Sequence, residues 1–449
     1  MPRTRYPGAV LSIPARTLRL VAAHWPALLA WYLAGWLARY LIIELASYFG
    51  ATSALIGLLI LPLAALARLG SFIAMFLVLR PSMPAFQELR RSGRGTEEPA
   101  GAETGRRRVT EIVLTSILPF FTFYAAWQLL SVDVQQYATG SLQNINPFQT
   151  GVDRSGAVLN VRLDVWSVGV IVVAFAGRTL LKRYRPKLPA WTSVVAVYCE
   201  AVWIYIALYF INSYVAQFTG WIQGRAAVQW YESARAAALE VVHPIGVAWG
   251  AIEWAIDRTG GLVLLPLAWL TLAGIVYGRA LAAPKIAYRP KNVYYTGARK
   301  RIDGLPGQLR RRLAELGDGV TGRFKPIVSA FLLIWRAGAA PMGLFVLGYT
   351  VIEAASSWLL LAGVRLIGPH DLDSWWMPFD DILVFVVGVI VEPLRLCLSA
   401  AAYDFCLRRL EERRDAADAA AAEAEAEAEA GAGTGTGTGA PAPTPTAGS

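Results

Sequence analysis

Six charged residues lie near the middle of long apolar segments, a position where charged side chains are rare. They are three arginines and three glutamates: Arg39, Arg68, Glu200, Glu353, Glu392 and Arg395. A charged side chain near the centre of a bilayer costs about 2.5–3.5 kcal/mol, so such groups usually pair or face a water-filled space. Arginine can bind an anionic group, and glutamate can carry a proton. The six residues therefore predict either interhelical ion pairs that fix the packing of the helices, or a polar pathway or binding site inside a membrane.

The spacing of these residues predicts how they pair. Glu392 and Arg395 stand three residues apart, so they share a helix face. Pro393 between them should bend that helix and free a backbone carbonyl. Arg39 and Arg68 fall on adjoining segments and require counter-charges, which Glu200 and Glu353 are expected to supply. We therefore expect the segments to converge on one central polar site.

Further polar residues in these segments form a second group of candidates, which comprises Glu44, Tyr205, Tyr209 and Asn212. Glu44 lies about 10 Å beyond the centre of its segment, at 1.5 Å per helical residue. The tyrosines and the asparagine follow one helical stripe, which either packs or lines an aqueous space. Arg178 lies near the end of its segment, where a long side chain can reach the headgroups, so the sequence gives it no further role.

The composition identifies the elements that must hold these residues. Of the 449 residues 55% are hydrophobic and 16% charged, with a mean hydropathy of +0.43. Soluble domains carry roughly 25% charged residues, which excludes an ordinary cytosolic globule. A membrane span needs about 20 mostly apolar residues. The sequence predicts an all-α polytopic bundle of about eight spans in four hairpins, at residues 25–49 and 52–79, 109–130 and 162–181, 190–214 and 262–282, and 339–363 and 378–403.

Basic residues predict the orientation of the bundle. They crowd the N-terminal stretch, the connectors after the second, fourth and sixth spans, and the C-terminal side; the opposite loops hold only Arg154, Arg162, Arg225, Arg235, Arg258 and Arg365. This bias places both termini in the cytoplasm. The net charge of +10 then indicates contact with an anionic inner leaflet rather than with nucleic acid. Because arginine greatly outnumbers lysine, we expect a multi-pass protein of a bacterial inner (plasma) membrane.

The domain organisation follows from these spans. Residues 1–24 form a cytoplasmic or interfacial N-terminal segment, and two four-span units follow at 25–182 and 190–410. The first unit has a flexible basic loop at 83–108 and an outer loop at 131–161. The second has two outer interfacial helices in 219–259 and a basic amphipathic inner segment at 284–326. The acidic, low-complexity tail 411–449 should be disordered. Weak matches between the two units leave open whether they arose by duplication.

Searches for catalytic and metal-binding motifs are negative. The chain has neither G-x-x-x-x-G-K-[ST] nor H-E-x-x-H, and its three cysteines and three histidines have no zinc-site spacing, so no metal or cofactor is expected. The sequence favours a non-enzymatic transport or export component, or an envelope-assembly subunit, built round the central charges. Membrane protein partners fit this role. One alternative is a purely structural partner subunit. The other is a membrane enzyme of lipid or glycan chemistry, which would depend on Asp133, Asp371 or Asp373.

Overall fold

The computed structural model describes residues 12–91, 129–145, 165–184, 191–230, 265–280 and 338–433, with short stretches between 112 and 125 and single residues at 189, 233 and 263. Nearly all of these residues are helical, and no strand occurs among them. The predicted all-α class is therefore confirmed for the part of the chain that is described.

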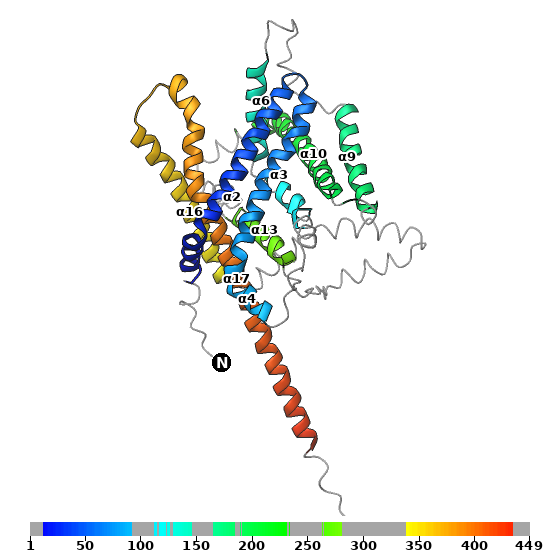
Figure 1. Cartoon of the computed structure of the whole chain (residues 1–449), viewed down its shortest axis with the longest axis vertical. Coiled ribbons are helices and arrows are strands. Elements are labelled where there is room, and N and C mark those ends of the chain that lie inside the picture. The colour runs from blue at the N-terminus through cyan, green and yellow to red at the C-terminus, as the bar shows by residue number, and fades with distance from the viewer. Residues whose placement is uncertain are drawn as a thin grey trace, which may run out of the picture.

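Five helices are long and apolar enough to cross a membrane. They are α2 (Ser12–Gly50), α3 (Ala54–Leu79), α10 (Thr192–Gln223), α16 (Ala339–Ile367) and the first part of α17 (Met377–Gly433). Shorter apolar helices lie within 112–122, in α9 (Val165–Tyr184) and in α13 (Leu265–Ala280). Figure 1 shows α2, α3 and α17 at the centre, α9 and α10 on one side and α16 on the other. This content fits a multi-pass membrane protein.

The helices α2 and α3 are connected by the turn at residues 51–53 and pack closely against each other. Gly35 of α2 lies so near α3 that a methyl group there would collide with Cβ of Ser71. The Ser71 hydroxyl donates a hydrogen bond to the carbonyl oxygen of Trp31 at 2.8 Å. After α3 the chain continues through the short helices η1 (Arg80–Ser82) and α4 (Pro84–Arg91). Small residues thus allow the backbones of α2 and α3 to approach.

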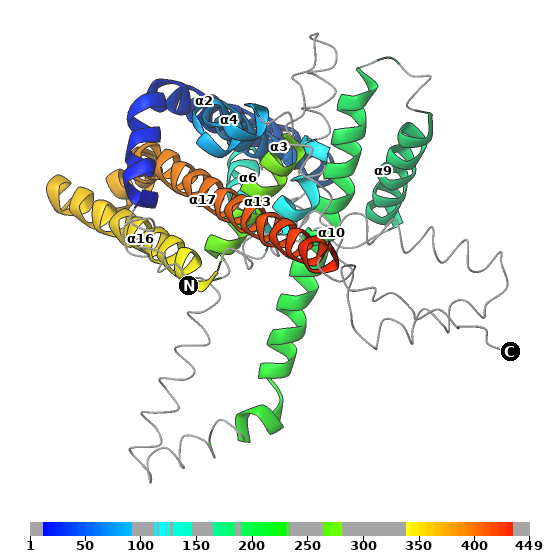
Figure 2. The ribbon, with the colours of Figure 1, turned by 90° about the horizontal axis from the view of Figure 1, so that it is seen from below.

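The helices α16 and α17 also pack side by side, connected through η4 (Leu372–Trp376). Gly348 and Gly363 of α16 admit Leu398 and Leu383 of α17. Figure 2 shows α17 running obliquely between α16 and the α2–α3 pair. Because α17 contacts α2, α3, α13 and α16, it connects the two halves of the described chain.

Many large apolar side chains remain exposed on the outer helices. Val173 of α9 is 70% exposed, and Leu366 of α16 is 87% exposed. Exposed apolar surface of this extent marks contact with lipid or with another protein. The buried core instead holds large aromatic side chains, among them Tyr124, Tyr205 and Tyr277.

Three segments predicted as loop or disorder contain helices. Residues 84–91 of the predicted loop 83–108 form α4, and residues 131–144 of the predicted outer loop form most of α6 (Leu129–Asn144). Residues 411–433 of the predicted disordered tail continue α17, which projects past α4 in Figure 1. Alanine and glutamate have high helix propensity, so this tail can extend a helix already started in the bundle. The composition of the tail alone does not show that it continues a helix of the bundle.

The structure tests some predictions only in part. Most of the predicted outer helices, beyond residue 230 of 219–259, and the whole amphipathic segment 284–326 lie outside the described residues. The same holds for residues 92–108, 146–161 and 434–449.

Candidate intramembrane polar site

Arg39 of α2 pairs with Asp133 of α6, a residue that the sequence placed in an outer loop. The Nε atom of Arg39 donates to Oδ1 of Asp133 at 3.0 Å, and its Nη2 forms an ion pair with the same oxygen. That Nη2 also donates to Oε1 of Gln136 at 2.7 Å. The hydroxyl of Tyr124 donates to the other oxygen of Asp133, Oδ2, at 2.5 Å. Asp133 is fully buried, and both of its carboxylate oxygens have partners.

Sequence reasoning placed Asp133 in an outer loop and considered it only for the enzyme alternative, because the helix that carries it is not apolar enough to resemble a span. Four polar side chains lie along α6 and lower its average hydropathy below that of a membrane span. They are Asp133, Gln136, Tyr137 and Ser141. These side chains nevertheless face the interior: Asp133, Tyr137 and Ser141 are all buried. The signal that could have found the helix is their spacing of three to four residues, which places them on one helical face.

Arg68 of α3 lies beside this pair without a carboxylate of its own. Its Cζ atom is 5.8 Å from the ring centroids of Phe72 and Tyr124. Among the residues that the structure describes, Arg68 forms no ion pair. It interacts electrostatically with Asp133 on one side and with Glu392 of α17 on the other. Arg68 thus interacts electrostatically with two acidic groups and forms an ion pair with neither.

Arg395 of α17 bridges two glutamates, as the spacing of Glu392 and Arg395 predicted in part. Its Nη1 donates to Oε1 of Glu392 at 2.9 Å, and its Nη2 donates to Oε2 of Glu353 on α16 at 2.5 Å. The ring of Tyr349 lies 5.2 Å from Cζ of Arg395. Two buried atoms in this group, Oε2 of Glu392 and Nε of Arg395, have no hydrogen-bond partner in the described structure.

Tyr32 of α2 connects the two groups. A methyl group at Gly388 of α17 would collide with the Tyr32 hydroxyl, so this hydroxyl lies against α17 one turn from Glu392. Tyr32 interacts electrostatically with both groups, through Glu392 and through the three arginines of the centre. We call this connected set the central polar zone; it comprises Tyr32, Arg39, Arg68, Tyr124, Asp133, Glu353, Glu392 and Arg395.

Glu200 does not belong to this zone. It is buried on α10 and forms an ion pair with Arg178 of α9, so it does not supply the counter-charge expected for Arg39 or Arg68. The interpretation of Arg178 as a group that only reaches for the headgroups is wrong for the same reason. Its guanidinium carbon also lies 6.0 Å from the ring centroid of Trp203. The sequence does not show which face of each helix meets the other, and that decides this pairing.

In the structure, one residue of the second group of candidates borders the central polar zone and the others do not. Tyr205 is buried against Phe121 of the helix within 112–125, with ring centroids 5.9 Å apart, and it interacts electrostatically with Asp133. Tyr209 and Asn212 are half-buried further along α10, and Glu44 is exposed. Tyr205 therefore borders the central polar zone.

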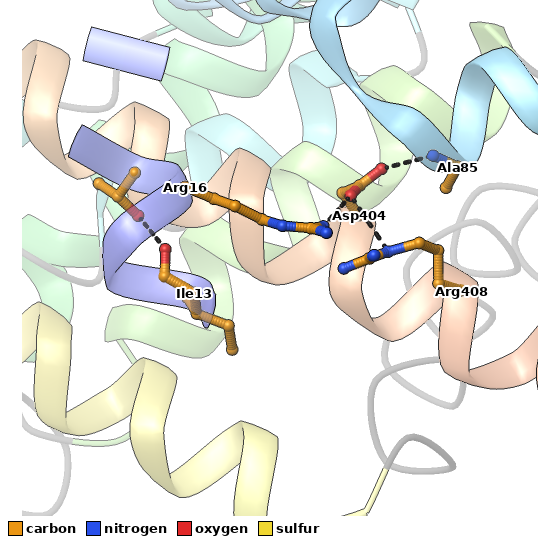
Figure 3. A network of polar contacts seen from close by, with 6 residues as sticks. Ile13, Arg16, Ala85, Asp404 and Arg408 are labelled. Carbon is orange, nitrogen blue, oxygen red and sulfur yellow. Dashed lines mark hydrogen bonds and ion pairs between the residues drawn. The ribbon is translucent and has the colours of Figure 1, made fainter. Parts of the chain in front are cut away.

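A separate polar network surrounds Asp404 of α17, which sequence reasoning did not select (Figure 3). Its Oδ2 pairs with Nη1 of Arg16 on α2 at 2.9 Å and with Nε of Arg408 at 3.5 Å. Its Oδ1 accepts a hydrogen bond from the backbone nitrogen of Ala85, in the first turn of α4, at 3.0 Å. One buried carboxylate thus holds three helices together. Its spacing of four residues from Arg408 was the available signal.

The acidic residues between α16 and α17 have a local structural role. Asp371 accepts hydrogen bonds from the backbone nitrogen and the hydroxyl of Ser374, each at 2.9 Å. These bonds lower the pKa of Asp371, the backbone bond most strongly, and they cap the first turn of η4. Asp373 is exposed. Within the described part of the chain, no three His, Cys, Asp or Glu side chains gather as metal ligands would.

Comparison of the chain with known protein families, curated proteins and solved structures finds no match. The chemistry of the central polar zone therefore carries the functional assignment.

Proposed function

We propose that this chain is a transport or export component of a bacterial inner membrane and that the central polar zone is its polar pathway. The five long apolar helices supply five of the spans. The three shorter apolar helices supply the others, giving eight spans in four hairpins. The distribution of basic residues supports a cytoplasmic position for both termini.

The incomplete hydrogen bonding of Glu392 and Arg395 is the observation that carries this proposal. In a buried ion-pair network with a purely structural role most polar atoms have hydrogen-bond partners, because each unpaired atom costs free energy. Asp133 meets that standard, whereas Oε2 of Glu392 and Nε of Arg395 do not. Arg68, which interacts electrostatically with Glu392, has no carboxylate partner in the described structure. Unpaired atoms at this depth are suited to water, protons or a polar ligand.

An envelope-assembly or partner subunit is the second candidate, and two ion-pair networks that tie helices together favour it. The Arg39–Asp133 pair and the Asp404 network tie α2 to α6 and α17 to α2 and α4. Such links give a membrane scaffold a fixed helix arrangement without any pathway. The enzyme alternative has less support, because Asp371 caps a turn and Asp133 is held by Arg39.

Cysteine accessibility distinguishes a pathway from a scaffold without knowledge of the substrate. Cys199, Cys397 and Cys406 are first replaced by alanine. Ser399→Cys is then introduced, because Ser399 is fully buried and follows Arg395 by one helical turn on the same face of α17. The label is a charged thiosulfonate, which reacts with thiolates and reaches only positions open to water.

Two matched positions serve as controls in the same membrane vesicles. Ala46→Cys reports a buried position of α2 away from Arg395, and Val386→Cys reports a lipid-exposed position of α17. A pathway predicts that the cysteine at 399 reacts at least ~10-fold faster than both controls. Equal, slow reaction at all three positions would reject the pathway and leave the scaffold.

A further inference from the structure

The charges of the central polar zone balance among the described residues. Its cations are Arg39, Arg68 and Arg395, and its anions are Asp133, Glu353 and Glu392. The zone is therefore neutral when every group is ionised. Because an uncompensated charge is costly in a low-dielectric interior, adding one proton favours the simultaneous entry of one negative charge.

Glu392 is the carboxylate of this zone that is best placed to accept that proton. Its Oε1 is occupied by Arg395, while its Oε2 is buried and has no partner in the described structure. Asp133 is less suited, because both its oxygens accept hydrogen bonds. The groups near Glu392 are Arg395 on its own helix, Tyr349 and Glu353 on α16, Arg68 on α3 and Tyr32 on α2.

The donors for an anion lie next to the same carboxylate. Nε of Arg395 is buried without a hydrogen-bond partner, and the guanidinium of Arg68 binds no carboxylate among the described residues. Both Arg68 and Arg395 interact electrostatically with Glu392, and Arg68 repels Arg395. A cation there would be repelled by both arginines. A dianion would leave one uncompensated negative charge after a single protonation.

We propose that the pathway carries a small monoanion together with one proton, with Glu392 as the proton acceptor and Arg68 and Arg395 as the anion-binding residues. This inference rests on the proposed transport function. In the loaded state the proton is on Glu392, and the anion replaces the lost negative charge beside the two guanidinium groups. Release of the anion leaves Arg68 and Arg395 without compensation, so the proton leaves Glu392 with it. Each cycle therefore moves no net charge.

Proton uptake during anion binding tests this coupling in the purified full-length protein. Chloride, nitrate and acetate are the probes, and binding is measured by titration calorimetry in two buffers of different ionisation enthalpy. The difference between the buffers gives the number of protons taken up per bound anion. We expect about one proton for at least one probe. Binding by acetate alone would identify a carboxylate ligand, and binding by chloride or nitrate would identify an inorganic anion; each result supports the proposal.

Three variants assign the roles. Glu392→Gln should bind the anion with no proton uptake, because its side chain is already neutral. Arg68→Met should weaken binding about 10- to 100-fold, the usual effect of losing one charged hydrogen-bond partner. Asp381→Asn, an exposed position near the start of α17, should keep the wild-type affinity and stoichiometry.

The outcomes separate this inference from the function on which it rests. Anion binding by the wild-type protein without proton uptake, or no binding of any of the three probes, would overturn the coupling. If the cysteine at 399 still reacts rapidly in either case, the pathway itself stands. If that cysteine is unreactive, the transport function fails as well. The wild-type titration decides the matter even if a variant does not fold.

Discussion

Arg39 on α2 and Asp133 on α6 form a buried ion pair across a sequence separation of 94 residues. The pair joins α6 to the α2–α3 hairpin, and Tyr124 completes the coordination of the carboxylate. Its satisfied geometry contrasts with the unpaired atoms of Glu392 and Arg395. The same kind of ion pair therefore serves two purposes in this chain, one structural and one proposed to be functional.

Asp133→Asn should strongly destabilise the protein. The asparagine keeps the size of the side chain but leaves the Arg39 guanidinium as an unpaired buried charge. Removing one partner of a buried pair costs about 3–5 kcal/mol. Unfolding in detergent, followed by loss of helical circular dichroism, measures this loss. Gln136→Leu removes only a neutral acceptor and should cost about 1 kcal/mol. Equal stability of Asp133→Asn and wild type would contradict the structural role.

The Arg178–Glu200 pair should behave as a replaceable structural contact. Glu200→Gln removes the carboxylate that Arg178 meets on α10 and should cost about 3–5 kcal/mol. The double variant Arg178→Met/Glu200→Met should recover most of this loss, because two packed apolar side chains often replace a buried pair without cost. Unfolding of wild type, Arg178→Met, Glu200→Met and the double variant completes a thermodynamic cycle. A double variant as unstable as the Glu200→Gln protein would show that the pair does more than hold α9 on α10.

Substitutions at Asp404 should separate its charge from its hydrogen bond to α4. Asp404→Asn loses the ion pairs with Arg16 and Arg408 but can still accept from the Ala85 backbone nitrogen. Asp404→Ala loses both and should be less stable by a further 1 kcal/mol or so, the typical value of a helix cap. Hydrogen exchange at α4 reports the cap directly. Unchanged protection of α4 in the alanine variant would rule out the cap.

Gly35→Ala should weaken the α2–α3 hairpin, because its methyl group would collide with the Cβ and hydroxyl of Ser71. Overpacking of this kind costs about 1–3 kcal/mol. Gly70→Ala on α3 is the matched control, since no atom lies within 4 Å of a methyl group there. That control should be neutral or stabilising by up to ~1 kcal/mol through helix propensity. Equal effects of the two substitutions would show that the helices do not approach closely at Gly35.

The local character of the chain could be predicted from its sequence. Long apolar segments determine the helices α2, α3, α10, α16 and the first part of α17, because only helices satisfy every backbone group without water. The sequence also identified Arg39, Arg68, Glu353, Glu392 and Arg395, since a charge within an apolar segment is conspicuous. Averaged hydropathy failed at α6 and in the tail, where interior-facing polar residues and helix propensity determine the structure.

Tertiary structure alone decided which charges on different helices meet. Periodicity gives the face on which a side chain lies, but the rotation of each helix and the identity of its neighbour depend on packing along the whole bundle. Arg39 therefore pairs with Asp133 rather than with a glutamate, and Glu200 pairs with Arg178. Asp404 forms an ion pair with Arg16 and accepts a hydrogen bond from the first turn of α4. Ion pairing falls off over a few ångströms, so a rotation of one helix face changes the partner without changing the sequence pattern.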